Sequence, residues 1–167
     1  MIATRTIVLA LSLIFSGSFF LHAQAAENSG LPLPRFVSLR SDEVNLRTGP
    51  GVRYPVDWIY NRRDLPVEVV AEFEAWRKIR DWQGTEGWVH QSMLSGRRMI
   101  VILGQTRKLR RESNDTSDAV AMIEAGVMGK LVQCPRNSAF CRVEAGGVTG
   151  WLKREEFWGV YRGEWVE

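Results

Sequence analysis

The sequence predicts an all-β protein built from two small β-barrels in tandem. From Phe36 onward, strand-like runs of three to six residues alternate with turns such as Gly49-Pro50-Gly51. This spacing is typical of short strands. No segment between Phe36 and Gly96 has an apolar stripe with the 3.6-residue period of a helix. The remaining observation is that the pattern occurs twice.

The internal repeat is carried by three anchors in the same order. They are Leu46-Arg47 and Leu109-Arg110, the strand-like runs 76–80 and 140–144, and Gly87-Trp88-Val89 and Gly150-Trp151-Leu152. The interval from the Leu-Arg pair to the tryptophan is 42 residues in both copies, from position 46 to 88 and from 109 to 151. A conserved order and interval within one chain indicate a duplicated structural unit. The middle anchor is displaced by one residue between the copies.

The first 25 residues have the layout of a secretory signal peptide. Arg5 is followed by the apolar run Ile7–Leu21, and Ala23-Gln24-Ala25 supplies the small residues of a cleavage site. The apolar run is short for a membrane-spanning helix. We therefore expect residues 1–25 to be removed, and the mature chain to be periplasmic or secreted without stable membrane insertion.

The mature chain is then divided into three parts. Residues 26–35 are an extended lead-in, residues 36–98 form the first repeat, and residues 99–167 form the second repeat with a C-terminal tail. A linker as short as Ser95–Arg98 predicts a rigid tandem. The run Met99–Leu103 predicts a strand covered on both sides, at a contact between the repeats.

Net charge gives no indication of a nucleic-acid partner. Without residues 1–25, the chain has 21 Lys and Arg against 19 Asp and Glu, a net charge of +2. Such a balance is too small for the basic surface that phosphate backbones require. An exported protein also has little contact with nucleic acid.

Two cysteines, Cys134 and Cys141, lie in the second repeat on either side of a turn-forming stretch that contains Pro135 and Asn137. An even number of cysteines in an exported chain is typical of disulfides. Two strands joined by this turn place the cysteines opposite each other, within bonding range. We predict a disulfide that closes a hairpin and stabilises it by about 2 to 3 kcal/mol.

The segment Val44-Asn-Leu-Arg-Thr-Gly-Pro-Gly51 resembles the start of the bacterial SH3 (SH3b) family, in which an Asn-Leu-Arg strand leads into a Gly-Pro-Gly loop. The later Gly87-Trp88-Val89 resembles the strand that ends its sheet. The second repeat is similar, but has Glu112-Ser-Asn-Asp115 in place of the glycine loop. The resemblance covers residues 36–161 and implies a five-stranded SH3-like barrel, twice. It also implies a binding role toward cell-wall peptides or protein partners.

Catalytic and metal sites are not indicated. The single histidine of the mature chain, His90, lies in the first repeat, whereas both cysteines lie in the second. A metal site requires three or four ligands at suitable spacing, and a nucleophilic cysteine requires a base. We expect no cofactor, no metal and no enzymatic activity.

The aromatic residues of the first repeat suggest a ligand surface. Strand alternation puts Trp76, Lys78, Arg80 and Trp82 on one face of a strand, opposite the face of Ile79. Aromatic rings flanked by cations suit an extended peptide or a glycan. The candidate binding residues are Tyr54, Trp58, Trp76, Lys78, Arg80 and Trp82. The alternative, that some of these aromatics pack against the second repeat, remains open.

These observations predict a non-catalytic exported binding module that recognises cell-wall peptide, peptidoglycan or an envelope protein. In this hypothesis the first repeat presents the ligand surface and the second braces it. The alternative is a structural or regulatory subunit that docks onto an envelope enzyme.

Overall fold

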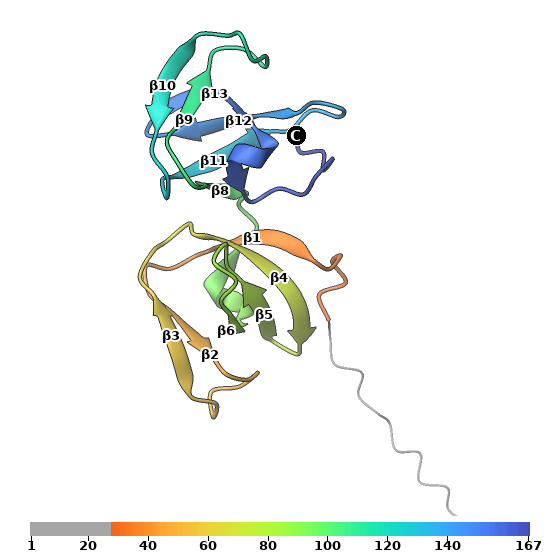
Figure 1. The fold of residues 1–167 in the computed structure, drawn as a ribbon. Helices are drawn as coiled ribbons and strands as arrows, with labels where there is room; N and C mark the ends of the chain where they lie inside the picture. Colours follow the sequence, from red (N-terminus) through yellow and green to blue (C-terminus); the bar gives the residue numbers. More distant parts are fainter. Residues whose placement is uncertain (1–27) are drawn as a thin grey trace, which may run out of the picture.

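The computed structural model describes residues 28–167, and the predicted signal peptide lies outside them. Two β-sheet units lie one above the other, joined by a single short connection between β7 and β8 (Figure 1). Each unit is a strongly bent sheet wrapped around its own core. Within residues 28–167, no helix is long and apolar enough to cross a bilayer.

The first unit is one antiparallel sheet of seven short strands. Its spatial order is β3 (Val56–Tyr60), β2 (Val44–Arg47), β6 (Glu86–His90), β5 (Trp76–Arg80), β4 (Pro66–Phe73), β1 (Arg35–Leu39) and β7 (Leu94–Ser95). The 3₁₀ turn η1 (Gln91–Met93) connects β6 to β7.

The second unit repeats this arrangement strand for strand. Its order is β10 (Ala119–Ile123), β9 (Arg107–Arg110), β13 (Val148–Lys153), β12 (Phe140–Ala145), β11 (Met128–Gln133), β8 (Met99–Ile102) and β14 (Phe157–Trp158). The turn η2 (Arg154–Glu156) takes the place of η1. The predicted all-β tandem is therefore confirmed.

Each sheet of the described chain has seven strands, where the resemblance implied five. The difference lies at the ends of each unit. In the first unit, β1 precedes the Asn-Leu-Arg strand β2, and the two-residue strand β7 follows η1. Both pair with each other, Leu39 opposite Leu94, and so bring the two ends of the unit together.

The repeat anchors occupy equivalent positions because the same packing constraint applies at both. Arg47 pairs with Trp88, and Arg110 pairs with Trp151. A Cβ atom on Gly87 would lie 2.5 Å from Cγ of Leu46, and one on Gly150 would lie 2.6 Å from Cγ of Leu109. The glycine of each Gly-Trp pair is thus required because a leucine packs directly on it. The displaced middle anchor is also in register, since Ile79 faces Gly87 and Val143 faces Gly150.

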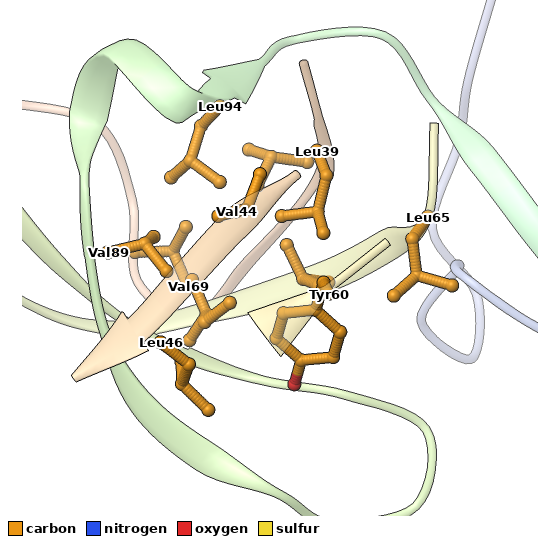
Figure 2. Packing of buried hydrophobic residues seen from close by; sticks show 11 residues of the cluster. Leu39, Val44, Leu46, Tyr60, Leu65, Val69, Val89 and Leu94 are labelled. Carbon is orange, nitrogen blue, oxygen red and sulfur yellow. The ribbon is translucent and has the colours of Figure 1, made fainter. Parts of the chain in front are cut away.

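Each unit has its own hydrophobic core. Figure 2 shows the first, in which Leu39, Leu46 and Val89 are fully buried. The second core contains Ile100, Leu109 and both cysteines. Separate cores explain how a chain of this length folds into two very small domains.

An aromatic contact joins the two units. The ring of Phe36 in β1 lies 4.7 Å from the ring of Trp158 and 4.6 Å from that of Tyr161, measured between centroids. The Tyr161 hydroxyl donates a 2.8 Å hydrogen bond to Glu68 in β4. Val101 of β8 is also fully buried, although it belongs to neither core. The expectation that the apolar run 99–103 is covered on both sides is met, since β8 contacts β4 of the first unit.

Candidate functional site

Two of the six predicted ligand-binding residues line one groove of the first repeat. Trp58 lies on β3, which has no neighbouring strand on its outer side, and its side chain is 57% exposed. Trp82 follows β5 and packs partly against the core. Together with Ile59, Arg62 and other residues they enclose a groove of about 360 Å³. The groove has aromatic walls from two separate parts of the sequence.

A hydrogen-bonded turn fixes the floor of this groove. The Asp81 carboxylate accepts 2.9 Å hydrogen bonds from the backbone N–H groups of Gln83 and Thr85. It also accepts a 3.0 Å hydrogen bond from the Tyr60 hydroxyl. Burial, followed by the charge of Asp81, raises the pKa of Tyr60, so this phenol stays protonated and donating. The turn that carries Trp82 is thereby held rigidly against β3.

Tyr54 lies in the loop between β2 and β3. Its ring occupies the space beside Gly49, where a Cβ atom would lie 2.4 Å from the ring. Arg47 holds this loop by donating hydrogen bonds to the carbonyls of Val52 and Tyr54, at 3.1 and 2.8 Å. The Arg53 guanidinium stacks 5.2 Å from the centre of the Tyr54 ring. Gly49 of the Gly-Pro-Gly motif therefore leaves the space that the Tyr54 ring occupies.

Trp76, Lys78 and Arg80 share the outward face of β5, as strand alternation predicts, while Ile79 is fully buried on the other face. Trp76 packs edge-on against the ring of His90, with centroids 5.5 Å apart. Lys78 forms a 2.6 Å ion pair with Glu86. None of these three residues lines the groove of Trp58 and Trp82.

Arg80 takes part in a polar cluster near the second repeat. It forms a 2.6 Å ion pair with Glu68, the same carboxylate that accepts the Tyr161 hydroxyl. The hydrogen bond to Glu68 and its charge raise the pKa of Arg80. Glu68 therefore links Arg80 indirectly to Tyr161 of the second repeat.

Trp82 was predicted to share a face with Trp76 because the alternation of side chains along β5 was continued beyond the end of that strand. Strand β5 ends at Arg80, and residues from Asp81 onward form a turn in which alternation no longer applies. The Asp-x-x-Gly stretch at Asp81–Gly84 is typical of such turns. That signal would have separated the two tryptophans.

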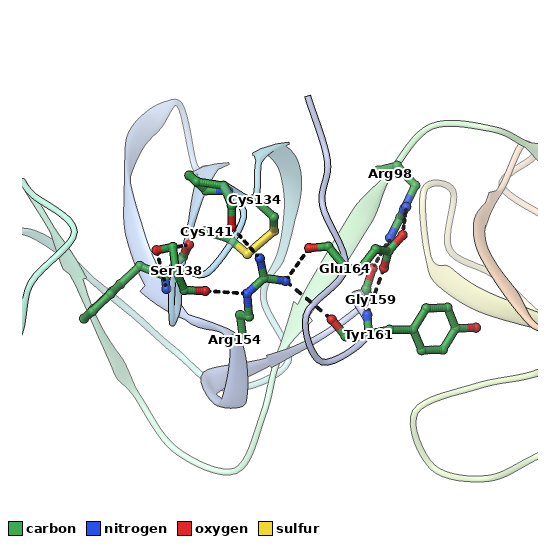
Figure 3. The surroundings of a disulfide bond; sticks show 10 residues. Arg98, Cys134, Ser138, Cys141, Arg154, Gly159, Tyr161 and Glu164 are labelled. Atoms are coloured by element: carbon green, nitrogen blue, oxygen red, sulfur yellow. Dashed lines mark hydrogen bonds and ion pairs between the residues drawn. A yellow bond between two sulfur atoms is a disulfide. The ribbon is translucent and has the colours of Figure 1, made fainter.

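The disulfide between Cys134 and Cys141 is present (Figure 3), which confirms the predicted hairpin staple. The two Cα atoms are 4.3 Å apart; Cys134 directly follows β11, and Cys141 is the second residue of β12. The backbone of Cys134 also forms hydrogen bonds in both directions with Val166 near the C-terminus. The staple therefore holds the tail as well as the hairpin.

His90 caps the 3₁₀ turn that follows β6. Its Nδ1 atom lies 2.7 Å from the Ser92 hydroxyl and accepts a hydrogen bond from the Ser92 backbone N–H at the start of η1. A histidine two residues from its serine partner closes a local turn, which accounts for the pair structurally. Across the part of the chain that the structure describes, no three His, Cys, Asp or Glu side chains group as metal ligands.

Comparison with protein families matches the bacterial SH3 domain twice, over residues 40–96 and 105–159. The chain belongs to the bacterial SH3 family. Bacterial SH3 domains are typically binding modules of the cell wall. A disulfide within such a domain fits an extracytoplasmic protein.

Solved structures with some similarity include NlpC1 and NlpC2 from Trichomonas vaginalis, at 14% and 12% identity. The TM-score is 0.35 for each, and the alignments cover 80% and 77% of this bacterial SH3 chain. This chain spans only 48% of either structure. A likeness at this TM-score supports no statement about activity. Comparison with curated proteins gives no match.

Proposed function

We propose that this tandem bacterial SH3 protein is a non-catalytic binding module of the periplasm, which recognises an extended cell-wall peptide through its first repeat. The observation that carries the proposal is the groove between Trp58 and Trp82. An exposed indole beside a rigid, hydrogen-bonded turn offers the apolar surface and fixed shape that peptide recognition uses.

The geometry of the groove supports a ligand in extended conformation. It runs along β3, an edge strand whose residues Val56 to Ile59 are all exposed. An extended peptide placed along such an edge gains backbone hydrogen bonds, while its side chains reach the neighbouring pocket. Tyr54, Trp76, Lys78 and Arg80 remain proposed ligand contacts of the first repeat, at its loop and outward sheet face.

The proposal is tested by sedimentation with insoluble peptidoglycan. Trp58→Ala removes a ring that is 57% exposed, so the fold should survive while pelleting is lost. Phe73→Ala is the matched control, because Phe73 is 43% exposed at the tip of β4 and does not line the groove. We expect the wild type and the control to pellet alike.

Two results would contradict the cell-wall proposal. One is equal pelleting of the wild type and Trp58→Ala. The other is no pelleting at all; capture of a single envelope protein in a pull-down would then favour the docking subunit. In either case, zymogram clearing by the isolated chain would contradict the non-catalytic part of the proposal.

A further inference from the structure

A second and larger groove lies beside the disulfide of the second repeat. Its volume is about 1050 Å³, and three walls enclose it. These are the loop between β11 and β12 at residues 136–139, the turn η2 with Lys153 before it, and the C-terminal tail at residues 160–165. In the first repeat the corresponding loop, between β4 and β5, is only two residues long, and β7 is followed by the short link to β8 instead of a tail.

The walls are fixed to one another by Arg154 (Figure 3). Its guanidinium donates hydrogen bonds to the carbonyls of Pro135 and Ser138 in the loop, at 3.1 and 2.8 Å. It also donates to the carbonyls of Tyr161 and Glu164 in the tail, at 3.4 and 2.7 Å. One side chain thus bridges loop and tail, so the groove is formed before any ligand arrives and binding costs little ordering.

Two arginines of the groove are available to a ligand. Lys153 is engaged in a 2.6 Å ion pair with Asp115, and Arg154 is occupied by carbonyls. Among the residues that the structure describes, Arg136 and Arg162 form no ion pair, and both are exposed. The lining also includes the exposed Glu155, so its four cationic side chains, Arg136, Lys153, Arg154 and Arg162, stand against the two carboxylates Asp115 and Glu155. The groove therefore has a net positive charge of +2.

Arg136 is held in a defined orientation by an aromatic ring. Its guanidinium carbon lies 4.5 Å from the centre of the Trp165 ring, whose side chain is 44% exposed. Stacking on an indole fixes the plane of a guanidinium and leaves its N–H groups free at the edge. A planar fork of this kind matches a carboxylate, which it binds with two parallel hydrogen bonds.

We propose that this groove binds the carboxylate groups of an extended acidic peptide. Arg136 receives one carboxylate, Arg162 attracts a second, and the apolar part of the peptide lies on Trp165. The site is separate from the groove of Trp58 and does not depend on it. The second repeat is then a binding domain in its own right, with a different chemical preference from the first.

The test uses two synthetic hexapeptides with blocked ends, one alternating Glu with Ala and the other alternating Gln with Ala. The full mature chain is labelled with ¹⁵N, and the indole N–H signal of Trp165 is assigned by its loss in Trp165→Phe. We expect the Glu peptide to shift this signal and the Gln peptide to leave it unchanged. Trp58→Ala should keep the shift, which separates this proposal from the previous one.

The variant Arg136→Gln/Arg162→Gln should weaken binding of the Glu peptide about tenfold or more, since two charge-assisted contacts are removed. Arg53→Gln is the matched control, because Arg53 is also an exposed arginine stacked on an aromatic ring. Unchanged signals of the remaining indoles verify the fold. The proposal is overturned if Trp165 does not respond, if the Gln peptide or inorganic phosphate shifts it equally, or if the double variant binds like the wild type.

Discussion

The two repeats close the same hairpin with different chemistry. In the first repeat, Glu72 lies opposite Arg77 and forms a buried 3.1 Å ion pair with it. In the second, the equivalent positions are Cys134 and Cys141, joined by the disulfide. Each pair follows a register shift at the same place in the strand. A covalent bond and an ion pair are therefore alternative solutions to one structural problem.

The comparison shows what an ion pair requires that a disulfide does not. Glu72 also accepts hydrogen bonds from the Ser29 backbone and hydroxyl, at 2.7 and 2.6 Å, and an ion pair from Arg35. Arg77 donates to the carbonyl of Glu74 and to Gln91. Buried charges are stable only when such partners satisfy them. The disulfide needs no partners, and its backbone is left to pair with the tail.

The largest expected effect comes from breaking the ion pair on its basic side. Arg77→Ala leaves Glu72 buried with Arg35 as its remaining cation, and should lower the free energy of unfolding by about 3 kcal/mol. Urea unfolding measures the change. Arg142→Ala, an exposed arginine on the equivalent strand β12, should cost less than about 0.5 kcal/mol. A loss below about 1 kcal/mol in Arg77→Ala would show that the pair contributes little.

Acid should weaken the ion pair of the first repeat. Burial alone would raise the pKa of Glu72, but hydrogen bonds from Ser29 and the charge of Arg35 outweigh it and lower the pKa from 4.5 to about 2. A depressed pKa gives stability that is complete above pH 4.5 and is lost as the pH falls toward 2, up to about 3 kcal/mol. Glu72→Gln should remove this part of the pH dependence, whereas Glu74→Gln should not. If the urea midpoints of Glu72→Gln and the wild type change with pH in the same way between pH 5 and 2.5, Glu72 does not cause the loss of stability in acid.

Removing the disulfide should cost somewhat less. Cys134→Ala/Cys141→Ala opens a loop of eight residues, for which chain entropy gives about 2.5 kcal/mol. Wild-type protein unfolded in the presence of a reductant should show the same loss, and the variant should be insensitive to the reductant. A variant as stable as the oxidised wild type would mean that the tail and Arg154 hold the hairpin unaided.

The smallest effect concerns the contact between the repeats. Tyr161→Phe removes the hydroxyl that donates to Glu68 while keeping the ring on Phe36. We expect a loss of about 1 kcal/mol. Tyr54→Phe serves as the control, because the Tyr54 hydroxyl has only an exposed 3.5 Å contact with Arg53. Equal stability of both variants would show that the aromatic packing alone joins the units.

The fold could be predicted from the sequence because the same glycine–leucine packing occurs in both repeats and leaves the same residue pattern in each. Gly87 and Gly150 are each dictated by one leucine, so their pattern survives even where the loops diverge. The disulfide was predictable for a similar reason, since a turn between two cysteines fixes their register. Local and periodic constraints of this kind are visible in one chain.

The two grooves could not be predicted from the sequence because segments far apart in the chain form their walls. Trp58 and Trp82 meet across two hairpins, and alternation could place each only relative to its own strand. The second groove depends on Arg154 binding the carbonyls of two separate loops, a contact with no sequence signature. Exposed aromatics such as Trp165 identify candidates, but only the tertiary arrangement shows which of them adjoin.

The packing of Phe36 against Trp158 and Tyr161 affects how strongly the protein can bind a ligand that reaches both repeats. It holds the two proposed grooves at one separation and one relative orientation. A polymer that presents peptides at the matching interval would meet the second groove at an effective concentration set by this geometry alone. A single free peptide would gain nothing from it, so the tandem is suited to distinguish a network of repeated ligands from its soluble fragments.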